Sequence, residues 1–292
     1  MARKMTWRDW INYDLENQFN PRVFLGAETE RQLNAWAVAS AEADILLRRM
    51  GGQFDVEYGS HPLMRYDQHI PEDRDQTAPI IINFHGGYWR SLDKADMRCH
   101  VHGLTSAGFE VFNVNYPLCP EVKVTEIIAC AVMAVRQILK TLAAAAPSQP
   151  ISSIILMGHS AGAHLALAVS KDKAIMPHLR GVVAISPIIE TEVVRHISAN
   201  HDIRFDEIEA KALNLLTYPP PTTGRYYFAI GSREPSGWID QSVELFTQLT
   251  RSGSDCKLYI VEDGAHFDIC DTLCDSQSVD SMRLIDWLKL SS

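Results

Sequence analysis

A serine stands at the centre of a glycine-bounded motif, Gly158-His159-Ser160-Ala161-Gly162. An apolar run over 153–157 precedes the motif, and a helix-like run over 161–171 follows it. This G-x-S-x-G context is typical of a sharp strand-to-helix turn, in which the glycines leave room for a crowded backbone and the serine is exposed in a strained conformation. The pattern predicts Ser160 as a nucleophile, placed near the positive end of the next helix.

A second glycine motif follows another apolar run. His85-Gly86-Gly87-Tyr88-Trp89 comes directly after 80–84. Acyl transfer needs preorganised donors for an oxyanion, and glycines let backbone N–H groups approach it without side-chain obstruction. We therefore predict an oxyanion hole made by N–H groups of Gly86, Gly87 or Tyr88 together with that of Ala161. His85 is interpreted as a residue that shapes this loop by hydrogen bonding.

A general base and an acid should follow the later strands, because hydrolases with this type of serine turn carry their catalytic residues in the chain order Ser, acid, His. His266 follows the predicted strand 256–261, and Glu234 follows the predicted strand 225–230. We predict His266 as the base and Glu234 as the carboxylate that fixes the imidazole tautomer. Three other carboxylates are weaker candidates for the acid: Asp240, Asp263 and Asp268.

Ring-bearing side chains near these motifs are candidates for substrate binding, namely Tyr88, Trp89, His159 and Trp238. Packing under the glycine loop is an equal alternative for Tyr88 and Trp89. His159 is interpreted first as a spacer that packs or hydrogen-bonds beside the serine, and His164 as a helix-packing residue.

The elements that must position these residues alternate along the chain. From residue 53 onward, β-rich runs alternate with helical stretches, which predicts a mostly parallel sheet of about eight strands with helices on both faces. We expect strands near 54–58, 63–69, 80–84, 110–115, 153–157, 181–186, 225–230 and 256–261. Helices are expected near 28–50, 94–107, 123–145, 161–171, 237–251 and 277–289.

Two segments depart from this alternation. Residues 12–22 are polar and aromatic, which favours a segment draped over the surface, and the helix 28–50 completes an N-terminal helical segment within 1–50. Residues 187–222 lack clear periodicity and end in three prolines, which is typical of an insertion. We expect the N-terminal segment and 187–222 to form a small cap on a single domain that spans 1–292.

Composition narrows the class of function. The 292 residues carry a formal net charge of −9, with a pI near 5.6, and this charge disfavours a nucleic-acid partner. The six cysteines are scattered without zinc spacing, so we expect reduced thiols, no bound metal and no cofactor. No stretch reaches the roughly 18 apolar residues of a membrane span. We expect a cytoplasmic protein that acts on a small acyl substrate and has no membrane partner.

The two glycine motifs resemble those of the hormone-sensitive-lipase-like branch of α/β-hydrolases, and within it the bacterial arylformamidase (kynurenine formamidase) group. The likeness extends to Leu92–Asp96, Val114–Val122, Tyr13–Arg22 and the helix 28–50, and to Glu234 followed by Gln241-Ser242. The resemblance implies the α/β-hydrolase fold, removal of a formyl or small acyl group from an aryl amine such as N-formylkynurenine, and a possible homodimer. Many members have Asp at the position of Glu234.

Two alternatives to an aryl formamidase stay open. The same residues could serve a carboxylesterase for short-chain acyl esters, since related sequences cleave simple esters. A non-catalytic binding protein of the α/β-hydrolase fold is the remote alternative. Such proteins usually lack a catalytic residue or an oxyanion glycine, and this chain has all of them.

Overall fold

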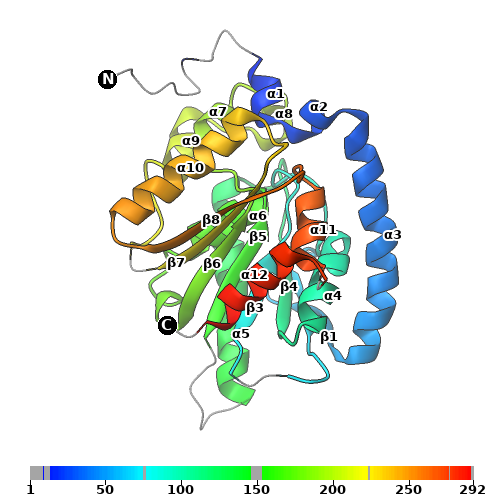
Figure 1. Cartoon of the computed structure of the whole chain (residues 1–292). Coiled ribbons are helices and arrows are strands. Elements are labelled where there is room, and N and C mark those ends of the chain that lie inside the picture. The colour runs from blue at the N-terminus through cyan, green and yellow to red at the C-terminus, as the bar shows by residue number, and fades with distance from the viewer. Residues whose placement is uncertain are drawn as a thin grey trace.

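The computed structural model describes residues 9, 14–74, 77–145, 153–222, 224–275 and 277–290. A single eight-stranded sheet crosses the described part of the chain (Figure 1). Its strands, in chain order, are β1 (Gly52–Glu57), β2 (Arg65–His69), β3 (Ile80–Phe84), β4 (Val111–Val114), β5 (Ile154–His159), β6 (Leu179–Ile185), β7 (Arg225–Gly231) and β8 (Asp255–Val261).

The sheet is mostly parallel, as expected. Its order is β1-β2-β4-β3-β5-β6-β7-β8, and only the β1–β2 and β2–β4 pairs are antiparallel. The central strands β3 and β5 are buried along their whole length, because helices cover both faces of a parallel sheet. This confirms the predicted α/β class and the α/β-hydrolase arrangement of the strands.

Helices cover both faces of the sheet (Figure 1). Along β3, Ile80 and Ile82 belong to one apolar cluster and Ile81 to the other, as the two-residue period of a strand requires. The first cluster includes side chains from α5 (Val124–Ala145), α6 (Ala161–Val169) and α10 (Ser236–Arg251). The second includes α3 (Ala27–Met50), α4 (Arg98–Ser106), α11 (Asp268–Cys274) and α12 (Val279–Lys289).

The N-terminal segment differs from the surface-draped stretch that the sequence suggested. It forms the short helices α1 (Leu15–Phe19) and α2 (Pro21–Leu25), and Leu15 and Phe19 are buried in the first apolar cluster. Tyr13 lies outside the described residues. Isolated helices this short are marginal in water, so contacts with the body of the protein stabilise them, and those contacts leave little trace in local sequence.

Other short helices were also missed. The stretch 187–222 contains α7 (Thr191–Val194), α8 (Asn200–Ile203) and α9 (Glu207–Leu213). Two short 3₁₀ helices complete the described elements, η2 (Lys94–Met97) before α4 and η3 (Met176–His178) before β6. The predicted helix 94–107 is therefore split between η2 and α4.

Helix α5 corrects one expectation. By length and composition it is the one described helix that could cross a membrane, although the sequence indicated that no stretch was apolar enough. Its buried side chains, among them Ile127, Val135 and Ile138, belong to the apolar cluster on one face of the sheet. The helix also contacts α6, the helix that follows Ser160. One face of the helix therefore packs against the core, and about a third of its apolar window is buried.

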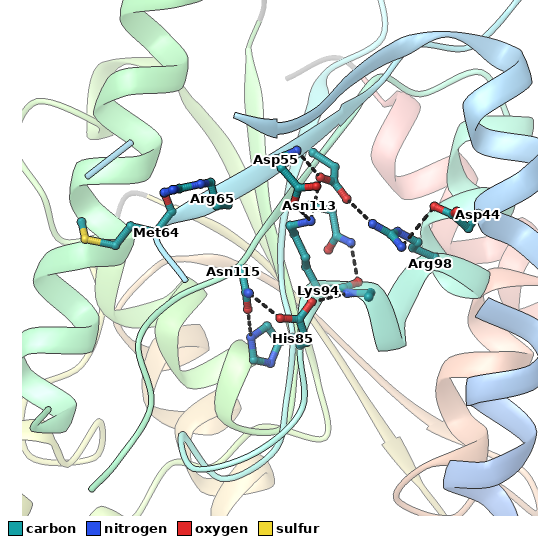
Figure 2. Close-up of polar contacts among 12 residues, drawn as sticks. Asp44, Asp55, Met64, Arg65, His85, Lys94, Arg98, Asn113 and Asn115 are labelled. Atoms are coloured by element: carbon teal, nitrogen blue, oxygen red, sulfur yellow. Dashed lines mark hydrogen bonds and ion pairs between the residues drawn. The ribbon is translucent and has the colours of Figure 1, made fainter. Parts of the chain in front are cut away.

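A buried polar network lies beside the central strands (Figure 2). Lys94 Nζ lies 2.7 Å from Asp67 Oδ1 and 2.7 Å from Asp55 Oδ1. Arg98 bridges the other Asp67 oxygen, at 3.1 Å, to Asp44, at 3.1 Å. The Asp67 side chain has no exposed surface. A charge in such a place is tolerated because cations and the Asp55 N–H surround it.

Removing one cation from this network should destabilise the fold. We expect Lys94→Met to lower the free energy of unfolding by about 3 kcal/mol, because Asp67 loses a partner and Arg98 compensates only in part. Lys123→Met is a matched control, since Lys123 pairs with Asp206 at 3.7 Å on the surface, and it should change stability by less than about 0.5 kcal/mol. Urea unfolding measures both. Equal effects of the two changes would contradict a structural role for the buried pair.

Candidate active site

Ser160 occupies a tight turn between β5 and α6. Its backbone lies at φ 56° and ψ −117°, a strained conformation for a residue with a side chain. A Cβ on Gly162 would lie 2.1 Å from the carbonyl oxygen of Phe84, and one on Gly158 would lie 2.3 Å from the Gly162 backbone. Both neighbours must therefore be glycine, which is the physical reason for the G-x-S-x-G spacing.

His266 and Glu234 lie together at the ends of β8 and β7. His266 Nδ1 is 3.1 Å from Glu234 Oε2, and both side chains are buried. The other Glu234 oxygen accepts hydrogen bonds from the Gly231 N–H, at 2.9 Å, and from the Ser186 hydroxyl. Two donors therefore hold Oε1 of Glu234 in place, and Oε2 can accept the Nδ1–H of His266.

Ser186 is a residue that the sequence reasoning missed. It follows β6 directly, so it ends at the same edge of the sheet as Ser160, and its backbone has a positive φ of 44°. Its carbonyl oxygen accepts a hydrogen bond from Trp238 Nε1 at 3.1 Å. Its place after a buried strand was the available signal, although one serine in a loop is too common to stand out.

The alternative carboxylates do not contact the His266 ring within the described residues. Asp240 and Asp263 are exposed. Asp268 accepts a hydrogen bond from the Ala265 N–H at 2.6 Å, so it organises the loop that carries His266. Glu234 is the carboxylate that the structure brings to the imidazole.

Ser160 and His266 line the same small pocket, of about 20 Å³. Within the described part of the chain, the Ser160 hydroxyl makes no hydrogen bond to His266 in this conformation. Such contacts often tighten only when a substrate binds. The other lining residues are Pro21, Arg22, Gly87, Tyr88, Leu92, His159 and Phe267.

The loop after β3 forms another wall of the pocket. Gly87, Tyr88 and Trp89 have positive φ values of 101°, 54° and 56°, and a Cβ on Gly87 would lie 2.0 Å from Ser91 O. Across the described residues, the N–H groups of Gly86, Gly87 and Tyr88 donate to no acceptor. Ala161 opens α6, where the first N–H groups of a helix lack partners. These donors are available to an anion.

His85 holds this loop from behind, as the sequence suggested. Its Nδ1 lies 2.8 Å from Gly86 O and its Nε2 lies 2.9 Å from Asn115 Oδ1. Burial lowers its pKa, and the hydrogen bonds to Gly86 and Asn115 partly offset that effect. Tyr116 stacks on the ring at 4.1 Å and donates its hydroxyl to His85 O at 2.6 Å. Asn115 also donates to Asp93, which connects the loop to the network in Figure 2.

His159 does more than separate its neighbours in the motif, because its side chain makes a specific hydrogen bond. Burial, together with the neighbouring charge of His266, holds its pKa well below the usual value, so the ring is neutral. Its Nε2 lies 2.6 Å from the backbone oxygen of His266 and therefore carries the hydrogen. His159 thus ties the residue before Ser160 to the loop that carries His266.

The four ring-bearing candidates divide into two pairs. Tyr88 and His159 line the pocket. Trp89 and Trp238 are fully buried and do not line it. Trp89 packs at 5.1 Å from His164, and Trp238 packs at 4.7 Å from the His266 ring. The two tryptophans are therefore supports of the site, because aromatic side chains of this size fill the space under the loops.

One cluster has side chains suited to a metal. Ligand atoms of Cys99, His100 and Asp271 lie within 4.8 Å of one another. Asp271 Oδ1 already accepts from Trp36 Nε1, at 2.8 Å, and from His100 Nε2, at 2.8 Å. Burial opposes protonation of His100, but Asp271 and Cys99 outweigh it and raise the pKa to about 9. The group is therefore an ion pair between buried His100 and exposed Asp271, and its contacts join α3, α4 and α11.

Comparison with known proteins agrees with this geometry. The family model BD-FAE matches residues 66–204. A kynurenine formamidase from Danio rerio is 24% identical over 285 residues, which cover 92% of this chain and 94% of that protein. A kynurenine formamidase from Salmo salar is 26% identical over 214 residues, which cover 69% of this chain and 68% of that protein.

Solved structures share the fold. A crystal structure described as a candidate thioesterase from Silicibacter sp. superposes with a TM-score of 0.78 at 23% identity and covers 95% of this chain and 99% of that one. Esterase B from Lactobacillus rhamnosis gives a TM-score of 0.63 at 17% identity and covers 90% of this chain and 96% of that one. The chain is therefore an enzyme of the α/β-hydrolase fold, similar to the hormone-sensitive-lipase-like branch and its kynurenine formamidases, and a hydrolase of the amide or ester class.

Proposed function

We propose that the protein is a serine hydrolase that forms an acyl-enzyme at Ser160 and removes a formyl or other small acyl group from an aryl amine. The observation that carries the proposal is the hydrogen bond between Glu234 and His266 Nδ1, at 3.1 Å, beside a pocket that Ser160 and His266 line together. The similarity to kynurenine formamidases supports N-formylkynurenine or a related aryl formamide as the substrate.

In the first half of the reaction, Ser160 attacks the carbonyl carbon of the acyl group. Glu234 accepts Nδ1–H of His266, so Nε2 is unprotonated and can take the proton of the Ser160 hydroxyl. Ser160 Oγ then bonds to the carbonyl carbon of the substrate. The resulting oxyanion accepts hydrogen bonds from the N–H groups of Ala161 and the Gly86–Tyr88 loop, each worth roughly 3 kcal/mol in the transition state.

The second half releases the two products. The C–N bond breaks as Nε2–H of His266 protonates the departing aryl amine, which leaves the acyl group as an ester on Ser160. His266 then removes a proton from water, the hydroxide attacks the ester, and the carboxylic acid leaves as Ser160 regains its proton. No group other than these side chains, backbone donors and water is required.

The packed walls of the pocket support a small acyl group. Gly87, Tyr88 and Leu92 are among the residues that line the space beside Ser160. Each additional methylene must displace packed atoms, since the wall residue Tyr88 is buried and its hydroxyl donates to Phe19 O. A formyl group meets this limit more easily than a longer acyl chain does.

Labelling should test the nucleophile directly. We expect a neutral fluorophosphonate to add one phosphonyl group to the wild type by intact-mass analysis. Ser160→Ala should remain unlabelled and lose roughly 10⁴-fold or more in kcat, because the covalent path is closed. Ser252→Ala, at an exposed position after α10, should label fully. Labelling of Ser160→Ala to the wild-type extent would reject Ser160 as the nucleophile.

The acid can be tested with an isosteric change. Glu234→Gln keeps the volume but can donate an N–H to Nδ1, which favours the wrong tautomer of His266, so kcat should fall by about 10³–10⁴. Asp263→Asn removes an exposed carboxylate from the base-bearing loop and should change kcat by less than about threefold. Steady-state kinetics, with circular dichroism to check folding, distinguishes these outcomes. Equal losses in the two variants would mean that Glu234 has no special part.

The preferred substrate distinguishes a formamidase from an esterase that uses the same catalytic residues. We expect N-formylkynurenine to be cleaved efficiently, and its N-acetyl counterpart to show a kcat/KM lower by about tenfold or more, as one extra methyl group costs in a tight pocket. p-Nitrophenyl acetate and butyrate serve as ester comparisons. If the esters are preferred by several orders of magnitude, the formamidase assignment is wrong and a short-chain carboxylesterase replaces it.

A further inference from the structure

Among the described residues, Arg22 is the one cationic side chain other than histidine in the wall of the pocket that contains Ser160 and His266. It belongs to α2, which lies with α1 at the end of the molecule where the β8 arrow points (Figure 1). No signal in the sequence singled it out, because its distance from the catalytic motifs along the chain hides its position in space. It has no role in the chemical steps described above.

The segment that carries Arg22 is held in place. Phe19 and Pro21 are buried, and Phe19 O accepts a hydrogen bond from the Tyr88 hydroxyl of the glycine loop. Gln18 Oε1 accepts from the Gly237 N–H, at 2.9 Å, at the start of α10. A guanidinium on such a segment is preorganised, so little conformational entropy is lost when it binds a ligand.

The charge of Arg22 has no counter-ion among the residues that the structure describes. Throughout the described residues it forms no ion pair, and its side-chain hydrogen bond goes to the neutral Ser91 Oγ at 3.2 Å. Arg90, in contrast, pairs with Asp202. Burial and the nearby positive charge of Arg90 both lower the pKa of Arg22. A half-buried guanidinium that stays charged and lacks an anion is costly, and an anionic ligand would remove that cost.

We propose that Arg22 binds a carboxylate carried by the aryl amine part of the substrate, and that the enzyme therefore prefers aryl amides whose leaving group carries a carboxylate. The proposal rests on the hydrolase function proposed above. The forked guanidinium matches the two oxygens of a carboxylate. A formyl group carries no charged substituent, so the carboxylate must belong to the leaving group, and the half-buried Arg22 is accessible both from the pocket and from solvent.

The charge of the whole protein makes a local cation useful for this contact. The chain carries a net charge of −9, which disfavours a carboxylate group at a place without a nearby cation. Arg22 supplies a positive point beside Ser160, and its partner Ser91 donates to Gly87 O at 3.0 Å. This second contact raises a competing role, in which Arg22 only supports the oxyanion loop through Ser91.

The decisive experiment compares N-formylkynurenine with its primary carboxamide, which has the same shape and lacks the carboxylate. We expect Arg22→Gln to lower kcat/KM for the acid by about 10- to 100-fold, mainly through KM, and to leave the carboxamide within about threefold. Arg22→Lys should retain part of the preference, since the charge remains and the fork is lost. Ser91→Ala removes the hydrogen bond between Arg22 and Ser91 of the glycine loop but keeps the charge of Arg22, so it should change kcat/KM for both substrates by the same factor.

Two results would overturn the proposal. Equal losses for both substrates in Arg22→Gln would assign Arg22 to loop support, and unchanged kinetics for both would deny it any role. If the wild type cleaves neither substrate, the proposed function fails, and titration of Ser160→Ala with free kynurenine and its carboxamide still tests Arg22. Free kynurenine should then bind more tightly than its carboxamide, and this difference should be present only while Arg22 is present. Equal binding of the two ligands would reject the proposal.

Discussion

The left-handed turn at Ser160 is the constraint on which the rest of the site depends. A strained backbone persists only where its surroundings over-determine it, and here two neighbouring strands do so. The Ser160 N–H donates to Ile185 O of β6 at 2.9 Å. On the other side, the carbonyl of Phe84 in β3 contacts the backbone of Gly162, with no room for a Cβ between them. The middle of the sheet therefore fixes the position of Ser160, the proposed nucleophile.

The same kind of contact repeats at the neighbouring strand ends. A Cβ on Gly86 would lie 3.1 Å from both Nδ1 and O of His159, so the glycine loop rests directly on the serine turn. A Cβ on Gly231, which precedes the acid-bearing loop, would lie 2.2 Å from Gly264 O in the base-bearing loop. Backbone packed against backbone is stiff, because few soft side chains intervene. The spacing among oxyanion donors, acid and base follows from these glycine contacts.

This geometry explains how much the sequence could predict. The strands, the six longer helices and the residues at three strand ends follow from local apolar runs and glycine spacing, so their places in the fold were accessible. Ser186, Arg22 and the helices α1, α2 and α7–α9 were not. Their positions depend on contacts between distant segments, such as Ser198 Oγ with Glu16. The burial of Trp238 was missed and that of Trp89 was only one of two equal alternatives for the same reason, since a motif does not reveal which way its aromatic side chains point.

Chemistry and recognition are thus carried by different parts of the chain. The proposed reacting groups come from the ends of parallel strands, where the backbone leaves little freedom, whereas Pro21 and Arg22 of α2, which contacts α1, contribute to the pocket wall. These helices are joined to the site by a few polar contacts, chiefly Tyr88 with Phe19 O and Gln18 with the Gly237 N–H. Changes in the N-terminal segment can therefore alter which leaving group fits without moving the strand ends. A residue such as Arg22, outside every catalytic motif, can on this basis determine substrate choice.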